Sequence, residues 1–505
     1  MRCVLRILFM VGLLALPTAL LAGPRGELVI GLQDDPDTLD PALNWSFVGR
    51  HVLQSLCDKL VDIDTDGRIV PMLAKSWRFS DEGRTLTLNL RDSLSFHDGT
   101  PLDAEAVRYN INRSLAVKGT RRKAEIDAVD TVDVIDVTTV AIRLKRASVS
   151  VLAALSDRTG MMVSPAAAEA AGEAFYKKPV CAGPYMFVEH KAQDRIVLER
   201  FAGYWRAGDF HFERIVYRPM QDSNVRLVNL RSGQLHLIER LAPTDVADVR
   251  RDASLAVFEA PTLGYFGITY NIGNGEGAKL PTAKSKLVRQ AIDSAIDREA
   301  INQVVFDGQF EAGNQPFPPS NPYYSAEYPV PRRDVAAAKA KLKEAGFDGL
   351  KLDLIVPGDP QRQQVAELLQ SMLAEVGITL TIQRVEMMSL LARAKDGNFQ
   401  ATLLGWSGRV DPDLNITPLL VCAAGGNDGR YCNPKLDAAL EAARSVEAPA
   451  ERKAHYAAVM AILLDEMPIS YLYHGRWIYG ARANLKGLRG YPDGIMRLDG
   501  VQRLN

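Results

Sequence analysis

The chain has 505 residues, and its 60 Lys and Arg against 61 Asp and Glu give a formal net charge of −1. No long run of one charge sign and no basic stripe is present, which argues against a nucleic-acid-binding protein. At about 150 residues per domain, this length predicts two to three compact units.

The first 22 residues have the features of a secretory signal peptide. Arg2 and Arg6 give a basic start, residues 7–21 form an almost uninterrupted apolar run, and the small residues Ala22 and Gly23 follow. This order is typical of a cleaved signal peptide, and the run is shorter than the about 20 apolar residues of a bilayer-spanning helix. We therefore expect cleavage after Ala22 and a soluble periplasmic protein, with an uncleaved N-terminal anchor as the alternative.

The N-terminal half of the chain has the alternation of half-buried strands. Leu86, Leu88 and Leu90 share one face of residues 84–91, and residues 140–144 repeat this period of two. Between these strands, Asp103 is placed to cap a helix whose apolar residues recur every four positions. This part of the chain is predicted to form an α+β unit with a mixed sheet.

After residue 330 helices and strands alternate. Helices are predicted at 334–346, 361–376, 387–394, 434–445 and 450–465, and strands at 351–356, 378–385, 399–406 and 469–480. Glycines at 346 and 377 stand where two of the helices end. Such alternation is typical of βαβ units and a largely parallel sheet.

Two units of different character without a low-complexity linker predict an α/β protein of two lobes with a ligand cleft between them. Lobe I is predicted to span 23–265, to include an extra N-terminal subdomain, and to be completed by 480–505. Lobe II is predicted to be inserted at 266–479. The segments 264–272 and 469–485 are the candidates for the chain crossings.

Four cysteines remain after cleavage, which is an even number in an exported chain and allows three disulfide pairings. Cys422 and Cys432 enclose a short Gly/Asn-rich loop and are expected to pair, which leaves Cys57 for Cys181. Free buried thiols are the alternative. The cysteine spacings do not resemble a zinc site, and neither a metal nor an organic cofactor is predicted.

Five segments, in order along the chain, resemble blocks of one protein family. They are residues 71–115, CAGPYMFVE (181–189), 287–309, AKAKLKEAGF (338–347) and RYCNPKLDAALEAA (430–443). The chain thus resembles the periplasmic solute-binding proteins of the peptide, nickel and opine ABC importers, solute-binding protein family 5. The resemblance implies a two-lobe, type II-like periplasmic binding fold, a small-molecule solute, and ABC permease subunits in the inner membrane as partners of a monomer.

The segment GWSGRVDPD (405–413) is the best candidate for solute binding, because it follows an apolar strand and ligands sit beyond the carboxyl ends of strands. Trp406 offers an aromatic face, Ser407 a hydroxyl, and Arg409 and Asp411 two opposite charges, which together match a zwitterion. Alternatively, Arg409 and Asp411 pair with each other or cap the loop.

The resemblance also implies a difference in specificity. Dipeptide-binding members of the family carry an acidic residue in this loop that holds the amino terminus of the peptide. Allowing a gap of one residue, Arg409 stands at this position here. The expected solute is a small zwitterion or anion, such as a short peptide or an opine, and this difference favours one with an additional anionic group.

Aromatic and polar residues elsewhere complete the predicted site. Trp45 and Ser46, with Asn44, follow the first predicted strand, and Tyr265, with Phe266, lies on a predicted crossing strand. Aromatic side chains line concave binding sites, but they are equally common in cores.

Two other functions fit parts of the sequence. A secreted hydrolase of peptides or esters would use Ser407, but GWSGR departs from the G-x-S-x-G pattern at Arg409, and neither S-x-x-K nor H-E-x-x-H occurs. A ligand-loaded sensor for a chemoreceptor would share the fold and the binding step of an importer protein.

The predicted anion contact is testable by mutation. An Arg409→Ala protein is expected to bind its solute more weakly in isothermal titration calorimetry, because a guanidinium that grips an anion is removed. Unaltered affinity would contradict this role of Arg409.

Overall fold

The computed structural model describes residues 26–446 and 448–504. The expected signal peptide and its cleavage point after Ala22 lie outside the described residues. Among the helices of the described part, none combines the length and the apolar character that a bilayer-spanning helix needs.

The first of the two large sheets has seven strands in the order β12-β19-β11-β1-β10-β9-β8. β1 runs parallel to β10 and β11, and the other pairs are antiparallel. The strands are β1 (Glu27–Leu32), β8 (Tyr185–Lys191), β9 (Arg195–Arg200), β10 (Arg214–Pro219), β11 (Leu237–Ile238), β12 (Leu255–Pro261) and β19 (Arg476–Arg482).

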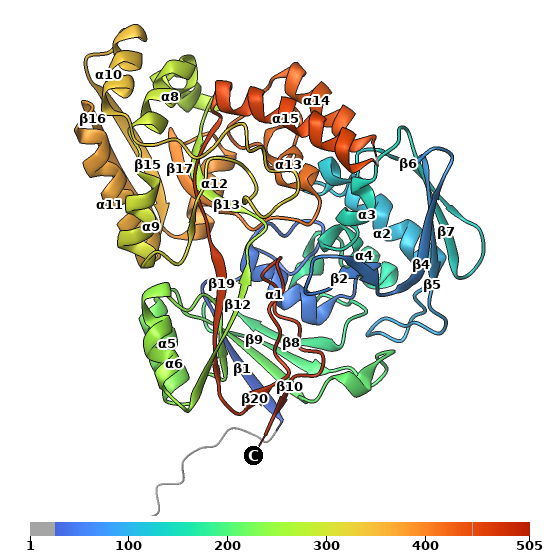
Figure 1. The fold of residues 1–505 in the computed structure, drawn as a ribbon. Helices are drawn as coiled ribbons and strands as arrows, with labels where there is room; N and C mark the ends of the chain where they lie inside the picture. Colours follow the sequence, from blue (N-terminus) through green and yellow to red (C-terminus); the bar gives the residue numbers. More distant parts are fainter. Residues whose placement is uncertain (1–25, 447, 505) are drawn as a thin grey trace, which may run out of the picture.

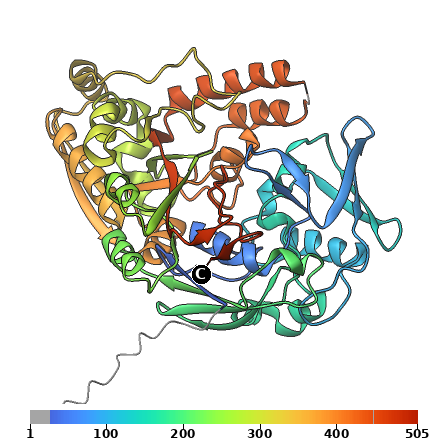
Figure 2. The ribbon, with the colours of Figure 1, turned by 60° about the horizontal axis from the view of Figure 1, so that its bottom comes forward.

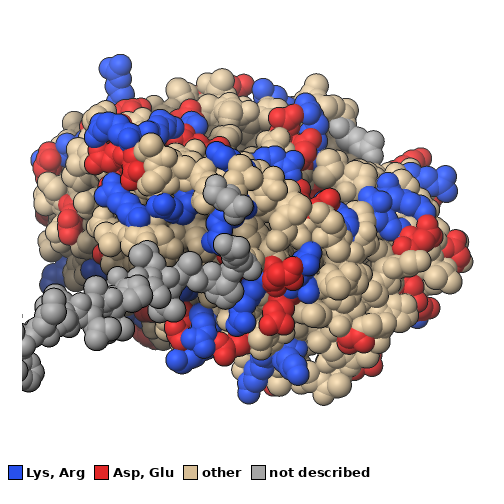
Figure 3. All heavy atoms as spheres, turned by 90° about the horizontal axis from the view of Figure 1, so that it is seen from below, with Lys and Arg blue, Asp and Glu red and all other residues tan. Residues whose placement is uncertain are grey.

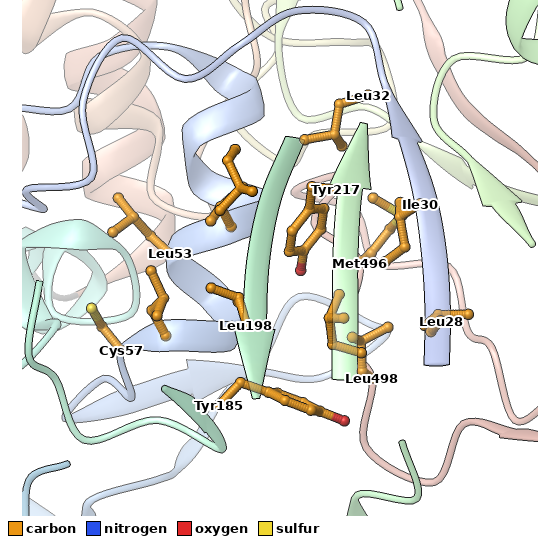
Figure 4. Close-up of a cluster of buried hydrophobic side chains, with 14 of the residues drawn as sticks. Leu28, Ile30, Leu32, Leu53, Cys57, Tyr185, Leu198, Tyr217, Met496 and Leu498 are labelled. Carbon is orange, nitrogen blue, oxygen red and sulfur yellow. The ribbon is translucent and has the colours of Figure 1, made fainter. Parts of the chain in front are cut away.

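One face of this sheet is covered by α1 (Phe47–Leu56) and the C-terminal segment (Figure 4). Leu28, Ile30 and Leu32 alternate along β1 and are fully buried, as the period of two requires. They pack in one cluster with Leu53 of α1 and with Leu498. The helices α5 (Ser223–Arg231) and α6 (Val246–Arg251) belong to a separate cluster with Leu255 and Ile478.

The second large sheet has six strands in the order β14-β18-β13-β17-β15-β16. β15 runs parallel to β16 and β17, whereas β13 is antiparallel to both β17 and β18. Four of its six strands, β15 to β18, therefore run in one direction as expected, whereas β13 and β14 run in the other and make three of the five strand pairs antiparallel. The strands are β13 (Tyr265–Tyr270), β14 (Glu311–Ala312), β15 (Leu350–Pro357), β16 (Ile378–Val385), β17 (Ala401–Trp406) and β18 (Ile469–His474).

The helices expected after residue 330 are confirmed around this sheet. Asp334 and Asp359 cap two of them by accepting hydrogen bonds from the backbone at distances of 2.8 and 3.0 Å. The predicted helices are α10 (Val335–Glu344), α11 (Pro360–Ala374), α12 (Met387–Lys395), α14 (Pro434–Arg444) and α15 (Pro449–Glu466). This part of the protein also contains α7 (Pro281–Lys284), α8 (Lys286–Ser294), α9 (Arg298–Phe306) and α13 (Thr417–Leu420), which were not among these predictions.

A smaller antiparallel sheet, of order β4-β5-β7-β6, forms the extra subdomain at the right of Figures 1 and 2. Leu86, Leu88 and Leu90 pack with Val107 and Ile111 of α2, as the alternation predicted. The elements are β4 (Ala74–Ser80), β5 (Thr85–Leu90), α2 (Ala104–Ala116), β6 (Val129–Val134) and β7 (Thr139–Leu144). Beside them lie β2 (Val61–Ile63), β3 (Ile69–Pro71), α3 (Ser150–Ala154) and α4 (Pro165–Ala171). A separate strand pair near the C-terminus consists of β20 (Leu485–Lys486) and β21 (Gln502–Arg503).

The chain passes twice between the large sheets, from β12 to β13 and from β18 to β19 (Figure 1). The first crossing lies close to the predicted boundary at 265. β19 pairs with β11 and β12 from Arg476 onward, so the second crossing lies at Gly475 rather than at 479. Below, lobe I denotes 26–263 with 476–504, and lobe II denotes 264–475.

Both expected disulfides are present. Cys57 bonds to Cys181, 124 residues away, and Cys422 bonds to Cys432 across 10 residues. Cys57 directly follows α1 and is fully buried in the core of lobe I. The two bonds therefore close loops of very different length.

We expect the loss of the long-range disulfide to cost more stability. A disulfide stabilises mainly by restricting the unfolded chain, by about 5 kcal/mol for a loop of this length and about 3 kcal/mol for the short one. In denaturant unfolding, Cys57→Ala/Cys181→Ala should therefore lose more free energy than Cys422→Ala/Cys432→Ala. The reverse order would contradict this account.

Candidate functional site

A cavity of about 120 Å³ lies between the lobes. We call it the central cavity. Lobe I contributes a wall that includes Asp34, Trp45 and Arg240, and lobe II a wall that includes Arg362 and Trp406. The other lining residues are Gln33, Ser46, Phe47, Val48, Arg158, Thr262, Phe266, Met387, Leu391, Leu404, Gly405, Ser407 and Trp477.

Two further pockets continue the central cavity. The first, here the Phe310 pocket, shares Arg240, Arg362 and Phe266 with it. The second, here the Tyr265 pocket, shares Trp45 and Trp406. The three spaces form one cleft, with the two tryptophans at one end of the central cavity and the two arginines toward the other.

The tryptophans join the two walls. Their ring centroids lie 5.3 Å apart at an interplanar angle of 45°. Trp406 ends β17 and its Nε1 donates to Asn415 Oδ1 at 3.1 Å. The backbone N–H of Trp45 donates to the carboxylate of Asp37 at 2.6 Å. The Trp45 ring also packs against the hydrophobic cluster of lobe II that contains Trp406, so the two tryptophans form one aromatic contact between the lobes.

The two serines at the cavity wall are hydrogen-bonded within the protein. Ser46 caps α1 by accepting from Gly49 N at 3.2 Å, and its hydroxyl donates to Asp37 at 2.6 Å. Ser407 accepts from Arg50 and Arg409, at 3.2 Å each. Among the described residues, the partners of Ser407 are guanidinium groups and not a base. This hydroxyl therefore lacks the activation that a hydrolase needs.

Arg409 lies behind the cavity wall and does not line it. Its Nε is 2.5 Å from Asp157 Oδ2 of lobe I, and its side chain is buried. The turn before it requires glycine, since Gly408 has a φ of 80° and a Cβ there would meet Leu263 at 2.2 Å. The contact of Arg409 with a solute stays a prediction. In this structure the direct partner of the Arg409 side chain is the carboxylate of Asp157, which belongs to the other lobe.

Asp411 is engaged in a similar way. Its Oδ1 accepts from Arg452 Nη2 at 2.8 Å and from Ser150 Oγ at 3.0 Å, and it caps the turn at Asp413 N at 3.0 Å. The loop-capping alternative therefore describes Asp411 better than a pairing with Arg409. Its role as a receptor for an ammonium group stays untested.

The remaining predicted residues lie along the cleft. Tyr265 lines the Tyr265 pocket with Tyr431, and it packs edge-on against Tyr471 with centroids 4.6 Å apart. Phe266, its neighbour on β13, lines both the central cavity and the Phe310 pocket.

Sequence analysis missed the charged residues of the central cavity. Asp34 follows β1, and burial raises the pKa of its carboxyl to about 6, although Gln221 Nε2 donates to it at 3.1 Å. Arg362 at the start of α11 pairs with Asp359, Nε to Oδ2 at 2.5 Å. Asp34 and Arg362 both come shortly after the carboxyl end of a strand, β1 and β15 respectively. Ligands bind beyond the carboxyl ends of strands, so a search of the residues after these two strands would have found both.

Arg240 follows β11 and makes no ion pair among the described residues. Its guanidinium lies over the rings of Phe47 and Trp477, 5.0 and 5.3 Å from the centroids. Burial lowers the pKa of Arg240. A half-buried cation with aromatic neighbours and no ion-pair partner among the described residues is well suited to grip an anionic group of a solute.

Comparisons with known proteins identify one family. Residues 68–428 match the model of the bacterial extracellular solute-binding proteins, family 5 Middle. The glutathione-binding protein GsiB of Escherichia coli (strain K12) is 28% identical over 502 residues, which cover 95% of this chain and 96% of that protein. The dipeptide-binding protein of the same strain is 27% identical over 466 residues, 86% of each chain.

Solved structures show the same fold. AgaA of A. tumefaciens R10, in complex with agropinic acid, superposes with a TM-score of 0.86 at 25% identity and covers 95% of this chain and 99% of its own. The dipeptide-binding protein of Pseudoalteromonas sp. SM9913, in complex with Met-Leu, gives 0.88 at 23% identity, over 95% and 100%.

The raised pKa of Asp34 predicts a pH-dependent effect of its removal. The protonated carboxyl stabilises the fold fully below the ordinary pKa of 3.8, and this contribution is lost as the pH rises through about 6. Solute-free Asp34→Asn protein should therefore be more stable than the wild type above pH 6, by up to about 3 kcal/mol, and equal to it near pH 4. Urea unfolding at both pH values measures this, with exposed Asp66→Asn as control; a constant difference would contradict it.

Proposed function

The chain belongs to the bacterial extracellular solute-binding proteins of family 5, and we propose that its own solute is a small zwitterion or anion that it captures in the periplasm. Members of this family bind solutes for ABC importers and are not enzymes, so the hydrolase alternative is not favoured. The observation that carries the proposal is the cleft between the lobes, whose walls present Asp34 and Arg240 beside paired aromatic rings.

The charged groups of the cavity suggest how such a solute is held. The carboxylate of Asp34 can receive an ammonium group, and the free guanidinium of Arg240 can take a carboxylate in a bidentate contact. Trp45 and Trp406 offer faces to apolar parts of the solute. Glutathione, dipeptides and opines all carry anionic groups, and the first two also carry a primary ammonium group.

Because the contacts come from both lobes, the solute favours the closed state over the open one. A ligand shifts such an equilibrium only by its difference in affinity for the two states. Asp34, Trp45 and Arg240 contact the solute from lobe I, and Arg362, Trp406 and Ser407 from lobe II. The closed form then docks on permease subunits in the inner membrane, which release the solute.

We expect the protein to act as a monomer without a nucleic-acid partner. Figure 3 shows basic and acidic side chains interspersed over the face seen from below, without a continuous basic stripe. Mixed surface charge of this kind favours solubility over binding to a polyanion.

The first experiment is native mass spectrometry of the protein purified from the periplasm, followed by identification of the released molecule. We expect one zwitterionic or anionic small molecule per chain. An empty protein would be screened by thermal shift with glutathione, dipeptides and opines, where a ligand at about 100 times its Kd adds about 2.7 kcal/mol. An empty protein with no response in this screen would contradict the proposal.

A matched pair of variants tests the role of Asp34. For a solute that carries an ammonium group, Asp34→Asn should raise Kd by about tenfold or more, which corresponds to about 1.4 kcal/mol. Asp66→Asn changes a carboxylate that is largely exposed and paired with Arg68, and should leave Kd unchanged. Equal affinities of the two variants would contradict the ammonium contact.

A further inference from the structure

Four buried arginines meet where the lobes touch. Asp157 lies 3.1 Å from Arg50 Nε, 3.7 Å from Arg158 Nε and 2.5 Å from Arg409 Nε. Arg122 completes the group and pairs with Glu125, Nη1 to Oε1 at 2.7 Å. We call Arg50, Arg122, Arg158 and Arg409 the arginine cluster; their side chains are at most 5% exposed.

The arginine cluster holds more positive charge than its carboxylates can neutralise. Its four guanidinium groups face two acids, Asp157 and Glu125. Asp493 approaches Arg50 at 3.6 Å, but it is bound more closely by Arg497 at 3.0 Å. Arg497 and the nearby Lys59 balance Asp493 and Asp62, so this neighbouring network supplies no spare negative charge.

The other acids nearby do not remove the excess. Asp411 is matched by Arg452 at 2.8 Å. Asp37 reaches the cluster only through Asn44, which donates to Asp37 and accepts from Arg158 Nη1 at 2.8 Å. Even with the full charge of Asp37, four cations face three anions, and at least one buried positive charge is uncompensated.

Several donors of the cluster also lack acceptors. Among the described residues, Arg122 Nε and Nη2, Arg158 Nε and Arg409 Nη2 have no hydrogen-bond partner. Burial, followed by the charge of a neighbouring arginine, lowers the pKa of Arg158 and of Arg409 to about 9. Buried charges and buried donors without partners are costly, and a structural ion-pair network usually avoids them.

The cluster adjoins the solute cavity. Arg158 lines the central cavity beside Trp45 and Trp406. Ser407, which also lines it, accepts from both Arg50 and Arg409. The excess charge therefore lies at the tryptophan end of the cavity, whereas Arg240 and Arg362 border the Phe310 pocket at the other end.

We propose that the arginine cluster is a second anion subsite, which receives a carboxylate or a similar anionic group of the solute at the tryptophan end. This inference rests on the proposed function and narrows it: the solute carries two anionic groups, one for Arg240 and one for the cluster. A dipeptide with uncharged side chains has only one such group and is a poor match.

The subsite is tested with sodium malonate, a dicarboxylate, on protein stripped of solute by unfolding and refolding. All measurements use an Arg240→Gln background, because Arg240 offers malonate another position. Addition of Arg158→Gln removes a cluster charge at the cavity wall, and addition of Arg452→Gln is the control, since Arg452 is equally buried but matched by Asp411.

We expect saturable malonate binding by calorimetry in the Arg240→Gln protein, weakened at least about tenfold by Arg158→Gln and retained with Arg452→Gln. Without malonate, Arg158→Gln should leave Tm unchanged or raise it, because it removes one of the excess positive charges. Arg452→Gln should lower Tm, because it leaves the buried carboxylate of Asp411 without its cation. Equal malonate affinity with and without Arg158, or a fall in Tm for Arg158→Gln as large as that for Arg452→Gln, would overturn the subsite.

Failure of this inference differs from failure of the proposed function. A periplasmic protein that carries a solute with only one anionic group overturns the second subsite and leaves the binding function intact. The second subsite is also overturned if chloride saturates the cluster and malonate does not compete with it. A protein that binds malonate through Arg158 but carries and accepts no solute would instead contradict the proposed function.

Discussion

The carboxylate of Asp157 joins the two lobes through buried ion pairs. It faces Arg50 and Arg158 of its own lobe and Arg409 of the other lobe, within 2.5 to 3.7 Å. One buried anion thus joins guanidinium groups from segments that are about 250 residues apart in the sequence. A buried charge is tolerated only when it is paired. Asp157 and Arg409 lie on different lobes, so separation of the lobes breaks their pair and exposes both to water together. The closed arrangement is therefore coupled to the electrostatics of this one position.

The aromatic wall of the cleft depends on the same contact. Trp406 lies against the guanidinium of Arg409, 4.7 Å from its ring centroid, and Trp45 lies against Arg122 at 5.2 Å. Both rings face the cavity from opposite lobes while cations of the cluster cover them from behind. Cation–π contacts of this kind hold a ring in place and bring positive charge close to whatever the ring binds. The site therefore combines apolar surfaces with an unbalanced positive potential, which favours flat or extended anionic solutes.

Opposite charges at the other end of the cavity serve a different purpose. Asp34 and Arg240 both follow strands of the first sheet and face the second lobe across the cleft. The pKa of the Asp34 carboxyl is raised by burial, so without a cation beside it the proton is retained more strongly than in water. An ammonium group of the solute reverses this effect, since a nearby positive charge favours the ionised carboxyl.

Local patterns in the sequence determined the elements and the family. The alternation of Leu86, Leu88 and Leu90, the caps at Asp103 and Asp334, and the blocks between 71 and 443 depend on neighbours within a few turns or strands, and the structure contains the elements they predict. The cysteine count and loop lengths likewise indicated both disulfides. Trp45, Ser46, Trp406 and Ser407, predicted from their places at or after strand ends, line the central cavity, and their contact with a solute stays a prediction.

Only the tertiary structure decided the charges of the site. Arg409 pairs with Asp157, which belongs to the other lobe and is far away in the sequence. Asp411 likewise accepts hydrogen bonds from Arg452 and Ser150. Arg240 has no sequence feature that separates it from the other arginines, since what distinguishes it is that it forms no ion pair within the described part of the chain. The excess charge of the arginine cluster is a sum over four segments of the chain. Electrostatic energy depends on distance and burial in three dimensions, and neither can be obtained from spacing along the chain.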